Sequence, residues 1–258
     1  KARNVFVNNN NIFKNQRITQ NFNNVLPFST IRYKFSDNKV LDVKYTTSSQ
    51  NPTISQLQPV RDNSNPNFIN IGNPNLKPEE AVSTEGGVKF WGKNLFASVA
   101  AFNRTSTNLI DWARNGSSTT WQPLNVNHVT FNGVETNIQA SFKTILEQIR
   151  VGYTYINANI NQTENYLSRY ALSNIRHHVT GVVNLKYHKN ITHSITVRHV
   201  NRELLADYTL FDSKLAYKLS AFNFYVDLSN IFNAKYTEAG YVTMPGRWLK
   251  IGFDYKLQ

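Results

Sequence analysis

The sequence predicts an all-β protein, more specifically an antiparallel transmembrane β-barrel. Three observations support this fold class: long runs of alternating polar and apolar residues, connections that alternate between short turns and long loops, and a composition low in both charged and apolar residues. No segment reaches the roughly 20 consecutive apolar residues that a membrane-spanning helix needs. No long segment has the helical period of about 3.6 residues either.

Alternation with a period of two is the dominant pattern of the chain. Between 148 and 155, for example, Ile149 and Val151 alternate with Arg150 and Gly152. Successive side chains of a strand point to opposite faces, so each such run has one apolar and one polar face. Many runs exceed the length of about five or six residues that is usual in globular proteins. In chain order, about twelve strands are expected near residues 1–9, 24–36, 39–48, 80–91, 94–110, 124–143, 148–160, 176–188, 191–203, 207–219, 221–232 and 246–257.

The connections predict which ends of the strands carry turns and which carry loops. One end would hold tight turns and the other long loops, as in the up-and-down barrels of outer membranes. A soluble β-sandwich or β-solenoid, the alternative all-β fold, would have shorter strands with turns about every 8–12 residues. Short turns are expected at 37–38, 92–93, 144–147, 189–190 and 220, and long links at 49–79, 111–123, 161–175 and 233–245.

The composition suits strands that separate two environments. Charged residues make up only 17% and hydrophobic residues 40% of the 258 residues, whereas 36 residues are Asn. Cys is absent, which excludes disulfides, Cys-ligated zinc and a Cys nucleophile. The formal charge of +12 is spread over the predicted strands and forms no single basic patch, so nucleic-acid binding is not expected.

Alternation also assigns side chains to the two faces of the predicted barrel. A cation at the middle of the lipid layer costs about 2–4 kcal/mol, whereas a position inside the barrel tolerates it. The residues expected to face lipid are Ile149, Val151, Phe222, Phe224, Val226, Leu249, Ile251 and Phe253. Those expected to face the lumen are Arg32, Lys34, Lys44, Arg150, Lys186, Arg198, Lys214, Lys218, Lys250 and Lys256.

Several motifs occur in a fixed order from residue 72 to the C-terminus. The segment 72–79 reads Gly-Asn-Pro-Asn-Leu-Lys-Pro-Glu, and 102–104 with 108–112 reads Phe-Asn-Arg and Asn-Leu-Ile-Asp-Trp. Asn-Gly-Val-Glu follows at 132–135, Asp-Leu-Ser-Asn-Ile-Phe-Asn-Ala-Lys-Tyr at 227–236, and Pro-Gly-Arg-Trp at 245–248. In this order they resemble the barrel of TonB-dependent outer-membrane receptors, and most closely the branch of the cobalamin receptors.

That resemblance implies a 22-stranded barrel with a plug domain inside it. Residues 1–258 would then be the C-terminal portion of the barrel, and the plug would be absent from this chain. The implied function is energy-coupled uptake of a scarce nutrient, such as a siderophore, cobalamin, an oligosaccharide or a peptide, across the outer membrane of a Gram-negative bacterium. The alternative is a structural or passive barrel that belongs to a larger envelope complex.

The same resemblance implies the partners. They are the N-terminal barrel half and the plug, the TonB complex, membrane lipid with lipopolysaccharide, and a surface lipoprotein. The excess positive charge has three open explanations: a basic lumen that attracts an anionic solute or holds acidic plug residues, surface cations that pair with lipopolysaccharide phosphates, or a local excess balanced in the rest of the barrel.

Ligand binding is expected on the long links, because loops carry function on a rigid scaffold. Aromatic and amide side chains there suit a large ligand of mixed polarity, although the same residues could simply pack the links together. The candidates are Arg61, Asn63, Asn65, Asn67 and Phe68 in the first link, Trp112, Arg114 and Trp121 in the second, Tyr166, Arg169 and Tyr170 in the third, and Tyr236, Glu238 and Tyr241 in the fourth.

No motif predicts an enzyme, a cofactor or a metal site. Gly-x-Ser-x-Gly, His-Glu-x-x-His and a phosphate-binding Gly-rich loop are all missing. His177 and His178 are strand neighbours and should point to opposite faces, so they cannot share a metal. A barrel hydrolase with Ser, His and Asn on adjacent strands leaves no local motif and stays open as an alternative.

Overall fold

The computed structural model describes residues 2–11, 16–59, 61–62, 69–116, 118–161, 166–168, 175–203, 205–238 and 242–256. One short helix, α1 (Ile54–Leu57), occurs in this part of the chain, and it is too short to cross a membrane. The strands are β1 (Ala2–Asn11), β2 (Gln16–Val25), β3 (Phe28–Ser36), β4 (Lys39–Gln50), β5 (Arg61–Asp62), β6 (Ile69–Ile71), β7 (Glu79–Trp91), β8 (Leu95–Asn115), β9 (Thr120–Ser141), β10 (Leu146–Asn161), β11 (Tyr166–Ser168), β12 (Ile175–His188), β13 (Ile191–Arg202), β14 (Tyr208–Leu219), β15 (Phe222–Ser229) and β16 (Trp248–Tyr255).

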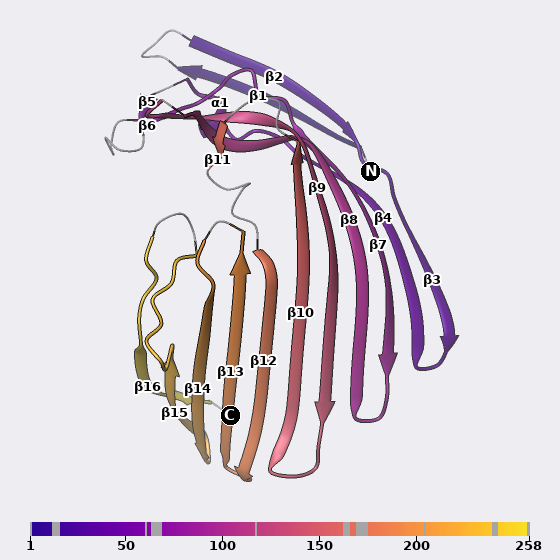
Figure 1. Ribbon diagram of the computed structural model, residues 1–258, viewed down its shortest axis with the longest axis vertical. Coiled ribbons are helices and arrows are strands. Elements are labelled where there is room, and N and C mark those ends of the chain that lie inside the picture. The colour runs from indigo at the N-terminus through magenta and orange to yellow at the C-terminus, as the bar shows by residue number, and fades with distance from the viewer. Residues whose placement is uncertain are drawn as a thin grey trace.

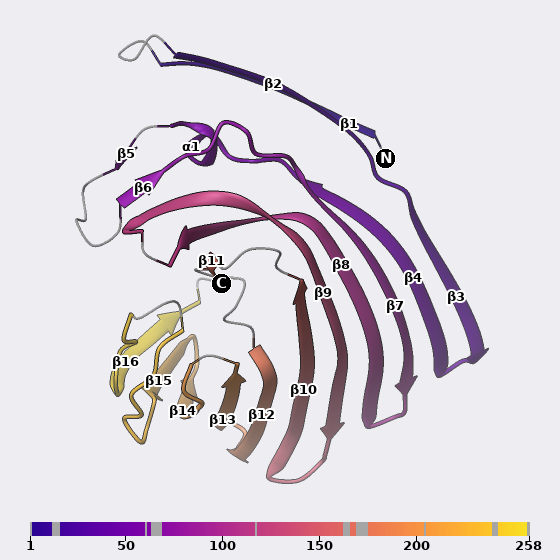
Figure 2. The same cartoon turned by 45° about the horizontal axis from the view of Figure 1, so that its top comes forward.

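The main sheet is an antiparallel meander. Its strand order is β16-β15-β14-β13-β12-β10-β9-β8-β7-β4-β3, so nearly every strand pairs with its neighbour in the chain. Figures 1 and 2 show that the sheet curves into an open half-barrel with β3 at one edge and β16 at the other. Tight turns such as those after β3, β7 and β12 lie together at one end (Figure 1). This is the up-and-down arrangement that the link lengths predicted.

Most of β2 was not predicted, because only its residues 24 and 25 fall within the predicted run 24–36. The predicted run 24–36 breaks at Leu26 and Pro27, between β2 and β3. Pro27 has no N–H for a strand ladder, but its carbonyl accepts a hydrogen bond from the Thr47 amide at 3.1 Å. Pairing with β4 therefore extends to the break, and beyond it β2 forms a separate hairpin with β1.

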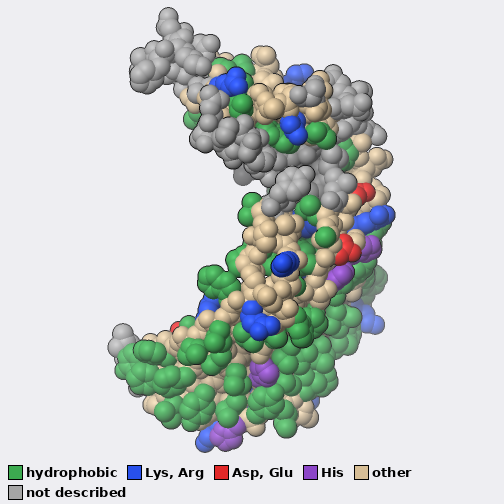
Figure 3. Space-filling model, turned by 60° about the vertical axis from the view of Figure 1, so that its left-hand side comes forward, with side chains coloured by type: hydrophobic (Ala, Val, Ile, Leu, Met, Phe, Trp, Pro, Cys, Tyr) green, Lys and Arg blue, Asp and Glu red, His purple; other side chains and the backbone are tan. Residues whose placement is uncertain are grey.

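One face of the main sheet, the apolar face, carries hydrophobic side chains. Residues paired across antiparallel strands share a face, and one such row consists of Tyr33, Leu41, Val88 and Val99. Figure 3 shows hydrophobic side chains gathered over the lower part of the molecule. So wide an exposed apolar surface is expected of a protein that contacts lipid. The exposed members of the predicted lipid-facing set are Val151, Phe222, Phe224, Val226, Leu249, Ile251 and Phe253.

The opposite face of the main sheet, the polar face, carries the charged side chains. Arg32 pairs in register with Asp42, and Asp227 pairs with both Lys214 and Lys250. These side chains share a face because paired residues of antiparallel strands point the same way. Arg32, Lys214 and Lys250, three of the predicted lumen-facing residues, therefore lie on this polar face.

The strands extend further than predicted at the end opposite the tight turns. The prediction of a link at 111–123 was wrong, because β8 and β9 stay paired up to Ala113 and Gln122. Their outer edges are also occupied: β11 pairs with β8, β6 pairs with β9, and β5 pairs with β6. The resulting order β11-β8-β9-β6-β5 forms what we call the outer sheet. These extra partners satisfy backbone groups that a bare hairpin would leave unpaired.

The helix α1 was not predicted. A capping box fixes its start: the Thr53 side chain accepts from the Gln56 amide at 3.3 Å, and the Gln56 side chain accepts from the Thr53 amide at 2.8 Å. Four residues are too few to show a helical period, but Thr-x-x-Gln at 53–56 is the local signature of such a cap. That signature is the signal by which the helix could have been found.

Val99→Lys tests the assignment of the two faces. Val99 is 48% exposed on the apolar face, and a cation there should destabilise the protein by about 2–4 kcal/mol in a bilayer. Urea unfolding of the full-length protein in lipid vesicles measures this loss. Ser98→Lys is the matched control, because Ser98 pairs with Lys89 and Asn137 and lines a cavity on the polar face. An equal loss for the two variants would contradict the assignment.

Candidate ligand-binding site

Candidate residues from three different links meet on the outer sheet. Arg61 lies on β5, Trp112 and Arg114 on β8, Trp121 on β9, and Tyr166 on β11. Backbone pairing therefore assembles them, although they are up to about a hundred residues apart in the chain. Tyr236 and Glu238 lie elsewhere, beside β14. The candidates Asn63, Asn65, Asn67, Phe68, Arg169, Tyr170 and Tyr241 fall outside the described residues.

Arg114 and Trp121 pack against each other in the outer sheet. The Arg114 guanidinium carbon lies 5.1 Å from the centroid of the Trp121 ring, which is a cation–π contact. Arg114 Nη1 also donates to the Ser118 carbonyl at 2.7 Å, across the turn between β8 and β9. Trp121 is buried, whereas Trp112 on the same face of the outer sheet is only half-buried. Of the two tryptophans, Trp112 is therefore the one that a ligand can reach.

The start of the segment 72–79 holds α1 against the outer sheet. The Asn73 amide donates to the Gln56 carbonyl at 2.6 Å, and Asn73 Nδ2 donates to the Pro123 carbonyl at 3.1 Å. Gly72 is needed because of close backbone approach: a Cβ there would lie 2.0 Å from the Gln58 carbonyl oxygen. The first half of this motif thus has a structural role.

The end of the same segment is fixed on β9 and β8. Lys77 and Asn125 exchange two hydrogen bonds, from the Lys77 amide to Oδ1 at 2.8 Å and from Nδ2 to the Lys77 carbonyl at 2.9 Å. Leu76, next to Lys77, is buried. Glu79 forms an ion pair with Arg104 at 3.5 Å. Two motifs that are separate in the sequence are therefore joined by this pair.

A third motif, Asn-Gly-Val-Glu at 132–135 on β9, packs against Phe102 of β8. The ring of Phe102 lies over Gly133, where a Cβ would approach a ring carbon to 2.3 Å. Only glycine leaves this space on β9 for the aromatic ring. Asn103 lies on the opposite face from Phe102, and its Nδ2 donates to Asn132 Oδ1 at 2.7 Å.

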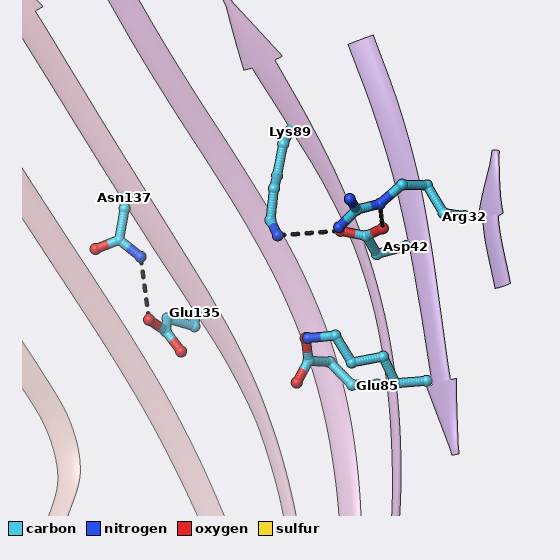
Figure 4. A network of polar contacts seen from close by, with 7 residues as sticks. Arg32, Asp42, Glu85, Lys89, Glu135 and Asn137 are labelled. Carbon is cyan, nitrogen blue, oxygen red and sulfur yellow. Dashed lines mark hydrogen bonds and ion pairs between the residues drawn. The ribbon is translucent and has the colours of Figure 1, made fainter. Parts of the chain in front are cut away.

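A charge network on the polar face is centred on Asp42. Arg32 contacts its carboxylate through Nε at 2.6 Å and Nη2 at 3.2 Å, and Lys89 Nζ reaches it at 3.0 Å (Figure 4). The Asp42 side chain is only 2% exposed, while Arg32 is 65% exposed. One buried carboxylate thus holds cations from two other strands, β3 and β7.

Further polar groups line cavities beside this network. Lys44 and Glu85 form an ion pair at 2.7 Å, and Asn137 donates to Glu135 at 3.0 Å. Lys44 and Glu85 lie on the adjacent strands β4 and β7, and Figure 4 shows Glu135 and Asn137 further along the same wall, on β9. A cavity of about 420 Å³ is lined by Lys44, Glu85, Phe102, Arg104 and Phe131 among others, and one of about 170 Å³ by Asp42, Lys89, Glu135 and Asn137 among others.

Beyond β15, an asparagine turn directs the chain toward β14. Asn230 has a left-handed backbone (φ 50°), its amide donates to Asp212 Oδ1 at 2.7 Å, and its side chain exchanges two hydrogen bonds with the Ala234 backbone at 2.8 and 2.9 Å. Asn is one of the few non-glycine residues that adopt this conformation readily. The turn brings Tyr236 onto Tyr208, with ring centroids 4.6 Å apart.

Histidines on the apolar face have hydroxyl partners. His193 contacts Tyr187 Oη at 3.0 Å through Nδ1 and Ser213 Oγ at 2.8 Å through Nε2, and His177 contacts Tyr153 Oη at 2.9 Å. Ser213 lies within a strand that is paired on both sides, so its backbone amides are used in ladders and form no oxyanion hole. The described residues contain no group of three metal-binding side chains.

The sequence of the chain matches a known family over most of its length. Residues 3–233 match the family described as TonB dependent receptor-like, beta-barrel. The chain belongs to this family. The antiparallel sheet with one apolar and one polar face is thus part of a receptor barrel of a Gram-negative outer membrane, as the ordered motifs predicted. The polar face is the lumen side of that barrel.

Relatives and solved structures agree with this assignment. The chain is 27% identical to the vitamin B12 transporter BtuB of Vibrio vulnificus over 170 residues, and 32% identical to BtuB of Photobacterium profundum over 101 residues. These matches cover 65% and 38% of this chain, but only 27% and 16% of the relatives. The siderophore receptor PirA of Acinetobacter baumannii has the same fold, with a TM-score of 0.71 at 17% identity, over 93% of this chain and 42% of PirA.

Gly72→Ala tests the structural role of the segment 72–79. The added Cβ would meet backbone, so α1 must separate from the outer sheet, at a cost of about 2 kcal/mol. Hydrogen exchange in the full-length receptor should show lost protection at the amides of Asn73 and Gln58. Gly86→Ala is the matched control, because nothing lies within 4 Å of a Cβ there. Unchanged protection in the Gly72 variant would refute this role.

Proposed function

We propose that this chain is the C-terminal portion, residues 1–258, of a receptor that imports a scarce nutrient across the outer membrane with energy from a TonB complex. The observation that carries the proposal is the family match over 3–233, on a curved sheet whose lumen side is charged and holds cavities. The matched part of the chain covers about a quarter of the length of the BtuB of Vibrio vulnificus, and we propose that the plug and the rest of the barrel lie outside the chain.

The partners follow from the same proposal. The sheet has two edges, β3 and β16, that lack a second neighbour within the described residues of the main sheet. In lipid such edges must be paired, and the remaining strands of the barrel would pair them. The plug would rest against the lumen side, lipid and lipopolysaccharide would surround the apolar face, and a surface lipoprotein would cover the outer sheet. No enzymatic activity is proposed.

The nutrient belongs to one of the classes that TonB-dependent receptors import. The sequence relatives named above are vitamin B12 transporters, and the structural neighbour is a siderophore receptor. The sequence similarity favours a cobalamin as the first compound to test. Siderophores, oligosaccharides and peptides follow, because the residues on the outer sheet suit a large ligand of mixed polarity.

Uptake assays test the proposal. Cells that lack the full-length receptor should lose energy-dependent accumulation of one labelled nutrient, cyanocobalamin being measured before ferric siderophores. The complemented strain should regain it, and removing TonB should abolish it again. A passive barrel would give uptake that persists without TonB and never exceeds the outside concentration, and that result would reject import in favour of the structural alternative.

Trp112→Ala and Trp121→Ala separate ligand contact from packing. Trp112 is half-buried, so its loss should weaken ligand binding to the full-length receptor about tenfold, which is about 1.4 kcal/mol. Trp121 is buried against Arg114, so its loss should cost about 3 kcal/mol of folding stability. Titration calorimetry and thermal unfolding measure the two effects. A Trp112 variant that binds normally would remove this residue from the site.

A further inference from the structure

Glu238, in the segment after β15, contacts two arginines of β13, one through its carboxylate and the other through its backbone carbonyl. Glu238 Oε1 accepts from Arg198 Nη2 at 3.0 Å and from the Tyr208 hydroxyl at 3.1 Å. The Glu238 carbonyl accepts from Arg202 Nη1. Arg198 and Arg202 are four residues apart in β13 and therefore share its lumen phase. A cationic patch of the lumen wall is thus occupied by an anion from the chain itself.

The position of Glu238 is built into the fold. The Asn230 turn starts the segment, and Tyr236 is fixed by its contact with Tyr208 and by a hydrogen bond from the Met244 amide to its carbonyl at 2.9 Å. Glu238 follows two residues later. None of its side-chain contacts is part of a strand ladder, so another anion can replace the carboxylate without breaking the barrel wall.

The patch keeps spare donors when Glu238 is bound. Arg198 offers a fork of N–H groups, yet a single ion-pair contact joins it to the carboxylate. Arg202 Nε is buried and has no hydrogen-bond partner among the described residues. Arg198 contacts the Glu238 carboxylate, whereas Arg202 contacts the Glu238 backbone carbonyl, so the carboxylate of Glu238 does not pair the charge of Arg202. A lone structural ion pair would leave neither a spare charge nor an unsatisfied buried donor.

The surroundings give the site an apolar side as well. Val200, which lies between the two arginines on β13, forms a small buried cluster with Tyr208 and Leu210, and Ile175 and Tyr236 pack against it. Arg198 and Glu238 are nevertheless 37% and 30% exposed, so a solute in the lumen can reach them. The Arg198 guanidinium also lies 5.7 Å from the Tyr208 ring centroid, which orients it over an aromatic surface.

We propose that Arg198, Arg202 and Tyr208 form a lumen binding site for an anionic solute with a carboxylate or phosphate group, and that Glu238 occupies this site until the solute displaces it. Paired arginines recognise both groups through charge-assisted hydrogen bonds. The biological role of the site in import rests on the function proposed above, but the binding itself does not. The solute replaces the Glu238 carboxylate as the bound anion, so no covalent step is involved.

Anion binding to the purified full-length receptor tests this site. Citrate is titrated calorimetrically at constant ionic strength, and inorganic phosphate in a second series, to distinguish the two groups. Glu238→Gln keeps the size of the side chain but removes the competing charge, so the affinity for at least one probe should rise about tenfold. Arg198→Ala should abolish that gain when combined with Glu238→Gln. Arg150→Ala, at a lumen-facing arginine on β10, two strands away from Arg198, is the control and should change nothing.

The outcomes are separable. If Glu238→Gln leaves both affinities unchanged, or if Arg150→Ala lowers them as much as Arg198→Ala, the site is refuted and Glu238 is only a structural anchor. Thermal unfolding of each variant shows whether the fold persists, and the conservative Glu238→Gln still decides if Arg198→Ala does not fold. Nutrient uptake is measured separately, so a variant that binds citrate in a receptor without import activity would overturn the proposed function and leave the anion site intact.

Discussion

Pairing of the backbone within the protein is the constraint on which this structure depends. The hydrocarbon of a membrane offers no partner to an N–H or C=O group, so a spanning strand must be paired along its whole length. The meander from β3 to β16 does this for each inner strand. Because every strand is then fixed in register, alternation in one strand continues across the sheet. Rows such as Tyr33, Leu41 and Val88 follow directly from that register.

This constraint also explains what the sequence could predict. Strand positions and faces are encoded locally, since each residue must suit lipid or lumen wherever the strand crosses the membrane. The outer sheet was not predictable in the same way. There β6 joins β9, and β11 joins β8, between segments about 50 residues apart. Outside the lipid other segments pair with the strands, so alternation no longer marks the end of a strand. The failed boundary at 111–123 has this cause.

The candidate site was predictable in part for a related reason. Candidate residues from three of the long links lie together on the outer sheet, but residue type does not reveal exposure. Trp112 and Trp121 looked equivalent in the sequence, yet Trp121 is buried beneath Arg114. Arg198 was expected in the lumen, whereas its contact with Glu238 depends on the Asn230 turn. A contact between residues 40 positions apart leaves no trace in a local pattern.

The lumen wall places few carboxylates among many cations, and this gives each carboxylate a large effect. Asp42 holds both Arg32 and Lys89, and Glu238 holds Arg198 together with the Tyr208 hydroxyl. The chain has 28 basic and 16 acidic residues, so its carboxylates cannot pair every cation one to one. Displacing one shared carboxylate therefore releases more than one donor on the same wall. Such a lumen should exchange anions more readily than one with matched ion pairs, because an incoming anion gains all the donors that the displaced carboxylate had bound.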